Sequence, residues 1–386
     1  MKFKIFILLI VATLLLFLFF RLLPILFDRG LNRVRLTPPY NIPAEVLELH
    51  NRLFVVDLHC DFLLWDRDLL KKGVYGQTDL PRMLMGNLAF QVFGVVTQFP
   101  GFQNRSRTKK GWDSITPLVI CQGWPPKTWS GFLQRALYQA KRLQDFARDS
   151  AGKLRLVGSA AELKELITKR NAGKKVIGAF LSLEGVQALE GKIENLDLLY
   201  KAGYRMLGLS HFFDTDAGGS AHSEEKGGLS PYGKTLVQRI QSGKMIIDLA
   251  HSSPAVFEDV FKLSIAPLVV SHTGVRGTCD NERNISDKQI HGIAATGGII
   301  GIGFFKKAVG DIKIEDTARA IRYVANLAGV AHVAIGSDFD GAVITPMDIS
   351  GLALLTQALI KEKFSEEEIE MIMGGNFIRV VEQCLE

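Results

Sequence analysis

Eight short apolar runs alternate with longer amphipathic stretches along most of this chain, and this alternation constrains the fold more than any other feature. Most runs are continuously apolar, which is typical of strands buried on both faces of a parallel sheet. They cover residues 54–58, 88–96, 176–183, 206–210, 245–250, 267–271, 298–303 and 333–337. Helical patterns occur among them at 161–170, 193–202, 232–241, 317–327 and 365–373. Eight β-then-α units predict an α/β fold, a (β/α)₈ TIM barrel, and a doubly wound open sheet is the structural alternative.

The same pattern predicts the domain organisation. Residues 45–386 are expected to form one barrel domain, and a polar, proline-containing linker at 36–44 precedes it. The segment from about 97 to 158 separates the second and third predicted strands. We expect its loops and helices to lie beside the mouth of the barrel.

The first 35 residues have the composition of a membrane anchor or a signal segment. Residues 5–20 carry no charge and the apolar character resumes over 22–27, which is long enough for one transmembrane helix. Lys2 and Lys4 would suit the basic leader of a signal peptide, but no small-x-small cleavage site follows the apolar run. The sequence therefore favours a single-pass N-terminal anchor over a cleaved signal. Basic residues flank the span on both sides, so the side of the membrane on which the domain lies is left open.

The net charge of +6 does not indicate a nucleic-acid partner, because most of it lies near the N-terminus. Residues 1–40 contain six Lys or Arg and one acidic residue, which gives 6 − 1 = +5 and leaves +1 for the rest of the chain. No other Lys/Arg run is dense enough to follow a phosphate backbone. The four cysteines form no C-x-x-C pair, so they predict neither a zinc ribbon nor a disulfide framework.

Histidines and carboxylates follow the ends of most of the predicted strands. They are His59, Asp61, Glu184, His211, His251, His272 and Asp338. Because the carboxyl ends of the strands form the active site of a (β/α)₈ barrel, we expect these side chains to converge at its mouth. Imidazole and carboxylate groups suit a divalent ion such as zinc, and a shared carboxylate can bridge two ions. Cys60 is expected to point away from this centre, and His222, in a predicted loop, is assigned no chemistry.

At these residues the sequence resembles the membrane dipeptidase (renal dipeptidase) family, peptidase family M19, over about residues 45–382. The matching stretches are VDLHCD (56–61), LEG (183–185), IIDLAHSS (246–253), VSH (270–272), ERNISD (282–287), IGSDFDG (335–341) and GGNF (374–377). Their order and spacing together carry the resemblance. The segments 212–219 and 273–275 depart from the family pattern, which leaves the preferred dipeptide open.

The resemblance implies a metal-dependent barrel hydrolase, a zinc dipeptidase with two Zn²⁺ ions per chain. His59 and Asp61 would bind one ion, His251 and His272 the other, and Glu184 would bridge the two. A hydroxide shared by the ions would attack the peptide carbonyl of a dipeptide. His211 would stabilise the oxyanion, Asp338 would handle the proton, and Arg283 would pair with the free carboxylate of the substrate. The family also implies a homodimer.

Two other functions fit parts of the pattern. One is another two-metal, amidohydrolase-like barrel hydrolase acting on a lactone, a cyclic amide or a deaminase substrate. Such enzymes typically begin with His-x-His, whereas this chain has His59-x-Asp61. The other is a catalytically silent, membrane-tethered metal-binding barrel. The retention of every expected ligand and of Asp338 favours an enzyme.

Overall fold

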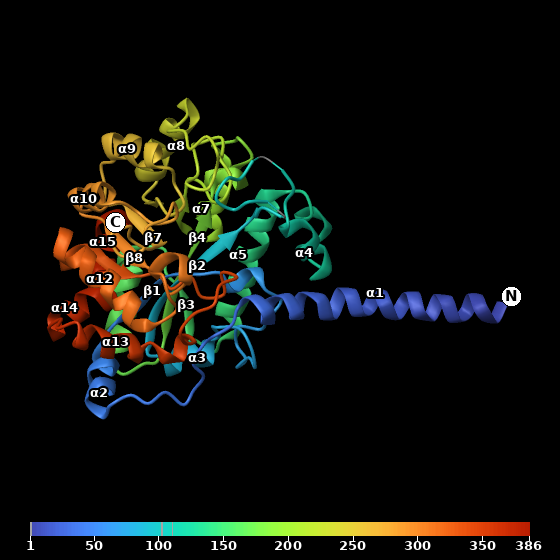
Figure 1. The fold of residues 1–386 in the computed structure, drawn as a ribbon, viewed down its shortest axis with the longest axis horizontal. Coiled ribbons are helices and arrows are strands. Elements are labelled where there is room, and N and C mark those ends of the chain that lie inside the picture. The colour runs from blue at the N-terminus through green and yellow to red at the C-terminus, as the bar shows by residue number, and fades with distance from the viewer. Residues whose placement is uncertain (1, 102, 110) are drawn as a thin grey trace.

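A parallel sheet lies at the centre of the computed structural model, which describes residues 2–101, 103–109 and 111–386 (Figure 1). Eight strands pair in the order β1-β2-β4-β5-β6-β7-β8-β9. They are β1 (Val55–Cys60), β2 (Leu88–Val96), β4 (Ile177–Glu184), β5 (Tyr204–Gly208), β6 (Ile246–Asp248), β7 (Val269–Thr273), β8 (Ile299–Ile302) and β9 (Val333–Ile335). A further short strand, β3 (Leu154–Leu156), pairs with β4 outside this order. The eight predicted strands are confirmed, and their ends lie within two residues of the predicted positions.

The sheet closes on itself between β1 and the segment that follows β9. Cys60 and Phe339 form a parallel bridge, and the backbone N–H of Asp61 donates to the carbonyl of Phe339 at 2.9 Å. The buried carboxylate of Asp57 accepts hydrogen bonds from the backbone N–H and the hydroxyl of Ser337, at 2.8 and 2.7 Å. The barrel is therefore confirmed, and the open-sheet alternative is wrong.

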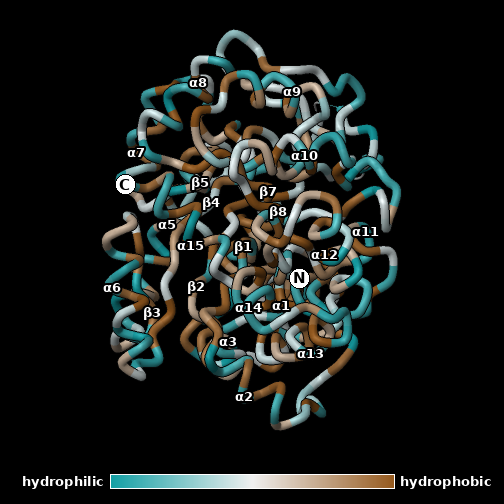
Figure 2. The backbone as a smooth tube through the Cα atoms, turned by 90° about the vertical axis from the view of Figure 1, so that its left-hand side faces the viewer, coloured by the Kyte–Doolittle hydropathy of each residue, from teal (hydrophilic) through white to brown (hydrophobic). Residues whose placement is uncertain are grey.

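Helices surround the strands. They are α2 (Ala44–Arg52), α3 (Leu80–Met85), α4 (Ile115–Cys121), α5 (Phe132–Asp149), α6 (Ala160–Asn171), α7 (Asn195–Ala202), α8 (Pro231–Ser242), α9 (Pro254–Leu263), α10 (Asp287–Ala295), α11 (Lys306–Val309), α12 (Ile314–Ala328), α13 (Ala353–Lys361), α14 (Glu366–Glu370) and α15 (Asn376–Cys384). Serine side chains accept a backbone N–H at the start of α6, α8, α9, α10 and α14, which satisfies donors that the first turn leaves free. Figure 2 shows hydrophobic segments gathered among the central strands and hydrophilic segments on the surrounding loops and helices.

Buried aromatic rings help to join the sheet to α15. The ring centroids of Phe90 and Phe377 lie 4.9 Å apart, and those of Phe90 and Phe180 lie 5.3 Å apart. All three side chains are at most 2% exposed. Burying one such side chain contributes roughly 1.5–3 kcal/mol, so this packing fixes strands β2 and β4 against the C-terminal helix.

Helix α1 (Lys2–Leu31) extends away from the barrel as one long rod (Figure 1). Among the described residues it is the one helix long and apolar enough to cross a membrane, and a signal sequence would meet the same test. Its last turns and the residue that follows them contact the barrel, where Pro24, Asp28 and Asn32 are buried. Because residues four apart lie on one face of a helix, a single stripe of α1 makes this contact.

Candidate active site and metal centre

The histidines and carboxylates predicted from the strand ends converge at the carboxyl end of the barrel. His59 and His272 lie within β1 and β7, and Glu184 is the last residue of β4. The others lie one to three residues beyond the ends of β1, β5, β6 and β9, and they are Asp61, His211, His251 and Asp338. Every one of these side chains is buried. The strand ends therefore bring the predicted set together.

Glu184 lies at the centre of this cluster. Its Oε1 atom is 2.5 Å from Nε2 of His59 and 3.7 Å from Nε2 of His272. Its Oε2 atom is 2.9 Å from Nε2 of His211. The two oxygens therefore face different imidazoles, which is the arrangement that a shared carboxylate requires.

The remaining ligand candidates extend the cluster on both sides of Glu184. Oδ1 of Asp61 lies 3.3 Å from Nε2 of His59, and the Nε2 atoms of His251 and His272 lie 2.9 Å apart. Three groups have donor atoms within 4.8 Å of one another, namely His59–Glu184–His272, Glu184–His211–His251 and His59–Asp61–Asp338. Two of these groups share Glu184, which is consistent with a binuclear metal site.

The surroundings of the cluster fit metal ions. Within the described part of the chain, Oδ1 of Asp61 and both carboxylate oxygens of Glu184 are buried and accept no hydrogen bond of ordinary geometry. Buried oxygens without a donor are costly unless another positive group satisfies them. Gly94 in β2 leaves the space open, because a Cβ atom there would come within 2.5 Å of Asp61 Oδ1 and 2.7 Å of His59 Nε2. Imidazole and carboxylate donors around such a space suit a divalent cation.

Burial and charge shift the pKa values of this cluster. Burial alone would lower the pKa of His59, but the carboxylates of Glu184 and Asp61 raise it well above its usual value. Burial alone would raise the pKa of Glu184, but His211 and His59 hold it well below its usual value. Burial raises the pKa of Asp338 well above its usual range, and Asp61 and Glu184 add to the rise. Burial therefore favours the neutral form of Asp338, whereas the neighbouring imidazoles favour the ionised form of Glu184.

Two of the histidines have fixed partners on their Nδ1 atoms. Nδ1 of His272 lies 2.9 Å from the hydroxyl of Ser271, which donates to Asp248 at 2.5 Å. Nδ1 of His251 lies 2.9 Å from Nε2 of His222. Partners on the second ring nitrogen hold an imidazole in one orientation and one tautomer. Both rings therefore present Nε2 to the cluster.

His222, to which the sequence analysis assigned no chemistry, contacts one of the ligand candidates, His251. Its Nδ1 atom lies 3.0 Å from the carbonyl oxygen of Arg105, so its two ring nitrogens join His251 to the 97–158 segment. Burial, with the charges of Arg283 and His211 next in size, lowers the pKa of His222 to about 3 and keeps it neutral. No periodicity marks the loop that carries it, so the sequence held no signal for this contact.

Arg283 lies at the edge of the cluster, close to two of the ligand candidates. Its Nη2 atom donates to the backbone carbonyl of His272 at 2.6 Å and lies 3.3 Å from Nε2 of His251. The guanidinium also lies over the ring of Phe305, 5.7 Å from its centroid. Burial lowers its pKa, although a guanidinium stays charged at neutral pH. The predicted substrate-binding residue is thus beside the predicted ligands.

A closed parallel barrel with a buried imidazole and carboxylate cluster at the strand ends defines the class of metal-dependent barrel hydrolases. A family model for the membrane dipeptidases, peptidase family M19, matches residues 44–386. The chain therefore belongs to this family and is an M19 dipeptidase, a metallopeptidase.

Individual relatives agree with this assignment. An uncharacterized protein in the pqqA 5' region of Klebsiella pneumoniae is 31% identical over 254 residues, which cover 62% of this chain and 92% of that protein. Dipeptidase aclJ of Aspergillus oryzae is 26% identical over 387 residues, which cover 95% of this chain and 85% of the relative. The fold matches that of a metallo peptidase from Rhodobacter sphaeroides, solved with a phosphinate mimic of the dipeptide L-Ala-D-Ala. That match has a TM-score of 0.71 at 24% identity and covers 86% of this chain and 99% of the other.

Proposed function

We propose that this chain is a zinc-dependent dipeptidase with two ions per chain, and one observation carries the proposal. The two oxygens of Glu184 face different imidazoles, His59 on one side and His211 on the other, inside a buried group of metal-ligand side chains. A carboxylate in this position can join two cations roughly 3.5–4 Å apart. Zinc is proposed because its preferred ligands are imidazole and carboxylate.

The ligands divide into two sets around Glu184. His59 and Asp61 would hold one ion, and His251 and His272 would hold the other. The family resemblance supports this division, and the short distances within each set, from Asp61 to His59 and from His251 to His272, are compatible with it. When bound, the ions would lower the pKa of a water molecule enough to supply a hydroxide nucleophile at neutral pH.

The protein side chains would supply the remaining steps. Asp338 would accept the proton of the nucleophile as a carboxylate and then give it to the leaving amine, and its place beside His59 and Asp61 suits this role. His211 would donate a hydrogen bond to the oxyanion as the peptide carbonyl becomes tetrahedral. Arg283 would pair with the free C-terminal carboxylate of the substrate. A longer peptide has no carboxylate at that position, so this pairing would restrict cleavage to dipeptides.

Helix α1 would anchor the enzyme to a membrane. Its apolar residues before the last turns are exposed, and exposure of so long an apolar helix to water is unfavourable. An anchor of this kind would keep the barrel at the membrane surface. Membrane flotation of the expressed full chain, before and after carbonate extraction, tests this part of the proposal, and release by carbonate would contradict it.

A substrate panel with metal analysis tests the catalytic proposal. The panel contains an L-L dipeptide, L-Ala-D-Ala and a matched tripeptide, because the Rhodobacter sphaeroides relative was solved with a mimic of L-Ala-D-Ala. We expect cleavage of dipeptides, no cleavage of the tripeptide, and zinc as the metal that purifies with the chain. Metal without dipeptide cleavage would instead favour the amidohydrolase-like alternative, with a lactone, cyclic amide or deaminase substrate.

A further inference from the structure

The segment that follows Asp338 has an uncommon backbone conformation. Asp338, Asp340 and Ala342 have φ angles of 63°, 61° and 58°, so every second residue from 338 to 342 lies in the left-handed region. Residues other than glycine rarely adopt this backbone conformation, because their Cβ atom crowds the backbone. Such a segment keeps its shape only where its surroundings hold it. The position of Asp338 therefore depends on what holds residues 340 and 342.

Asp340 is held by several donors, and its side chain is fully buried. Its Oδ1 atom accepts the backbone N–H of Gln77 at 2.8 Å and lies 2.7 Å from Nη2 of Arg67, and its Oδ2 atom accepts the hydroxyl of Thr78. The indole N–H of Trp65 donates to its carbonyl oxygen at 2.6 Å. Arg67 and Trp65 lie in the segment that begins at Asp61, a proposed metal ligand. Asp340 thus joins the two active-site segments that follow β9 and β1.

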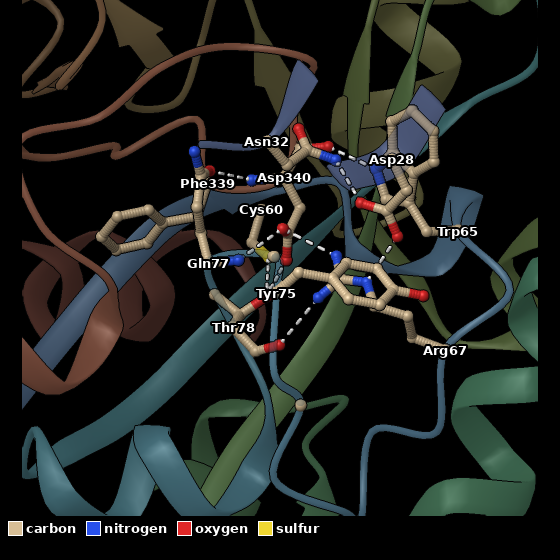
Figure 3. Close-up of polar contacts among 12 residues, drawn as sticks. Asp28, Asn32, Cys60, Trp65, Arg67, Tyr75, Gln77, Thr78, Phe339 and Asp340 are labelled. Atoms are coloured by element: carbon tan, nitrogen blue, oxygen red, sulfur yellow. Dashed lines mark hydrogen bonds and ion pairs between the residues drawn. The ribbon is translucent and has the colours of Figure 1, made fainter. Parts of the chain in front are cut away.

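The end of α1 completes this network, as Figure 3 shows. Oδ2 of Asp28 lies 2.8 Å from Nε of Arg67, so this guanidinium lies between the carboxylates of Asp28 and Asp340. Oδ1 of Asp28 accepts from the amide of Asn32 at 2.8 Å. The side-chain oxygen Oδ1 of Asn32 in turn accepts the backbone N–H of Ala342 at 2.9 Å. Asp28 in α1 therefore contacts Arg67, which holds Asp340, and Asn32 just after α1 contacts the backbone of Ala342.

The attachment continues beyond α1. The side-chain amide of Gln77 donates from Nε2 to the backbone carbonyl of Arg33 at 2.9 Å, and its Oε1 atom accepts the backbone N–H of Asp340 at 2.6 Å. Val34 and Thr345 form a parallel bridge. The chain leaving α1 is therefore paired with the chain leaving the active-site loop over several residues.

The α1 side of this attachment lies outside the part of the chain that the family model matches. That match begins at residue 44, whereas Asp28 and Asn32 precede it. A helix that served only as a tether would need no buried charge at its end, because burying a charge is costly unless it is paired. Asp28 is 3% exposed and is paired with the same guanidinium that holds Asp340.

We propose that the last turn of α1 and the residue after it are a built-in support of the active site, in which Asp28 and Asn32 are positioning residues for Asp338. They act through Arg67 on Asp340 and through the backbone of Ala342. This inference rests on the proposed proton-transfer role of Asp338. It also implies that the working enzyme retains the chain from about Pro24 onward, whether or not the apolar part of α1 is cleaved.

Kinetics of the full-length chain test this support. Asp28→Ala removes the partner of Arg67, Asp28→Asn keeps an acceptor of the same size, and Asn32→Ala frees the N–H of Ala342. Arg35→Ala is the matched control, because Arg35 ties the same part of the chain to the barrel through Asp311 at 3.0 Å, on the surface. Circular dichroism shows which variants are folded.

We expect Asp28→Ala to lower kcat about tenfold or more while KM changes less than about threefold, because the substrate contacts remain. Asp28→Asn keeps one of the two acceptor oxygens and should lose less kcat than Asp28→Ala, Asn32→Ala should give an intermediate loss, and Arg35→Ala should resemble the wild type. A folded Asp28→Ala enzyme with wild-type kcat would overturn the inference. If Asp28→Ala does not fold, wild-type kcat in Asn32→Ala overturns it instead. A wild-type chain that cleaves no dipeptide would count against the proposed function and not against this support.

Discussion

Nε2 of His222 lies 2.9 Å from Nδ1 of His251, which leaves the other nitrogen of His251 facing the ligand cluster. A carboxylate or a backbone carbonyl usually occupies this position behind a metal-binding histidine. Here a neutral histidine does so, and the carbonyl of Arg105 fixes its tautomer in turn. Because His222 accepts on Nε2 and donates from Nδ1, His251 donates from Nδ1 and is free to bind a cation through Nε2.

Removing this contact should weaken metal binding. We expect His222→Ala to lower metal affinity about 10- to 100-fold, because His251 loses the partner that fixes its tautomer. Competition with a chelator measures the affinity directly. His291→Ala is a control for the loss of a histidine, since His291 lies in α10 and belongs to none of the candidate metal groups. Equal affinities for His222→Ala and the wild type would contradict this role.

A methyl group on Gly94 should disrupt the site from the strand side. The added Cβ atom would come within 2.5 Å of Asp61 Oδ1, so the carboxylate or the strand must move. We expect Gly94→Ala to lose most of its activity and to bind less than two metal ions per chain. Gly227→Ala is the matched control, because a Cβ there meets no heavy atom within 4 Å. Wild-type activity and metal content in Gly94→Ala would show that Asp61 is not a ligand.

The buried charge at the end of α1 should make stability depend on pH. Burial raises the pKa of Asp28 from 3.8 to about 6, and the charge of Asp340 adds to this while Arg67 opposes it. Because the folded state binds this proton more tightly than the unfolded state, the proton stabilises the fold. The contribution is fully present when the pH is below the unfolded-state pKa of 3.8, and it is lost as the pH rises through about 6. The free energy of unfolding of the wild type, relative to Asp28→Asn, should therefore fall between about pH 4 and pH 6, by at most about 3 kcal/mol. Chemical denaturation across this range measures the difference, and a flat difference would contradict the shift.

Loss of the arginine beside the ligands should affect substrate binding most. We expect Arg283→Ala to raise KM for a dipeptide about 10- to 100-fold with a smaller change in kcat, because a charge-assisted pair to the substrate carboxylate is lost. A dipeptide amide, which lacks that carboxylate, should be cleaved about equally poorly by the variant and the wild type. If Arg283→Ala lowered kcat/KM equally for the dipeptide and for its amide, the proposed pairing of Arg283 with the substrate carboxylate would be wrong.

Much of the barrel could be predicted from the sequence, because strands buried on both faces are continuously apolar and therefore stand out. The ends of those strands also identified the ligand candidates, since Glu184 and His272 directly continue apolar runs. Three features escaped prediction because each depends on contacts between distant segments. His222 lies in a loop without periodicity, and Gly94 is one small residue within an apolar strand. Asp28 has the local pattern of a charge flanking an apolar helix, and only the fold shows it buried against Arg67.

The binuclear site depends on Glu184 as the carboxylate shared by both ions, and metal content measures this dependence. Elemental analysis of the purified full chain should give about two zinc ions per chain for the wild type. Glu184→Ala should give less than one, with nearly all dipeptidase activity lost, because both ions lose a ligand. Glu194→Ala, at an exposed site just before α7, should retain both ions and full activity. Wild-type metal content and turnover in Glu184→Ala would show that Glu184 does not bridge two ions.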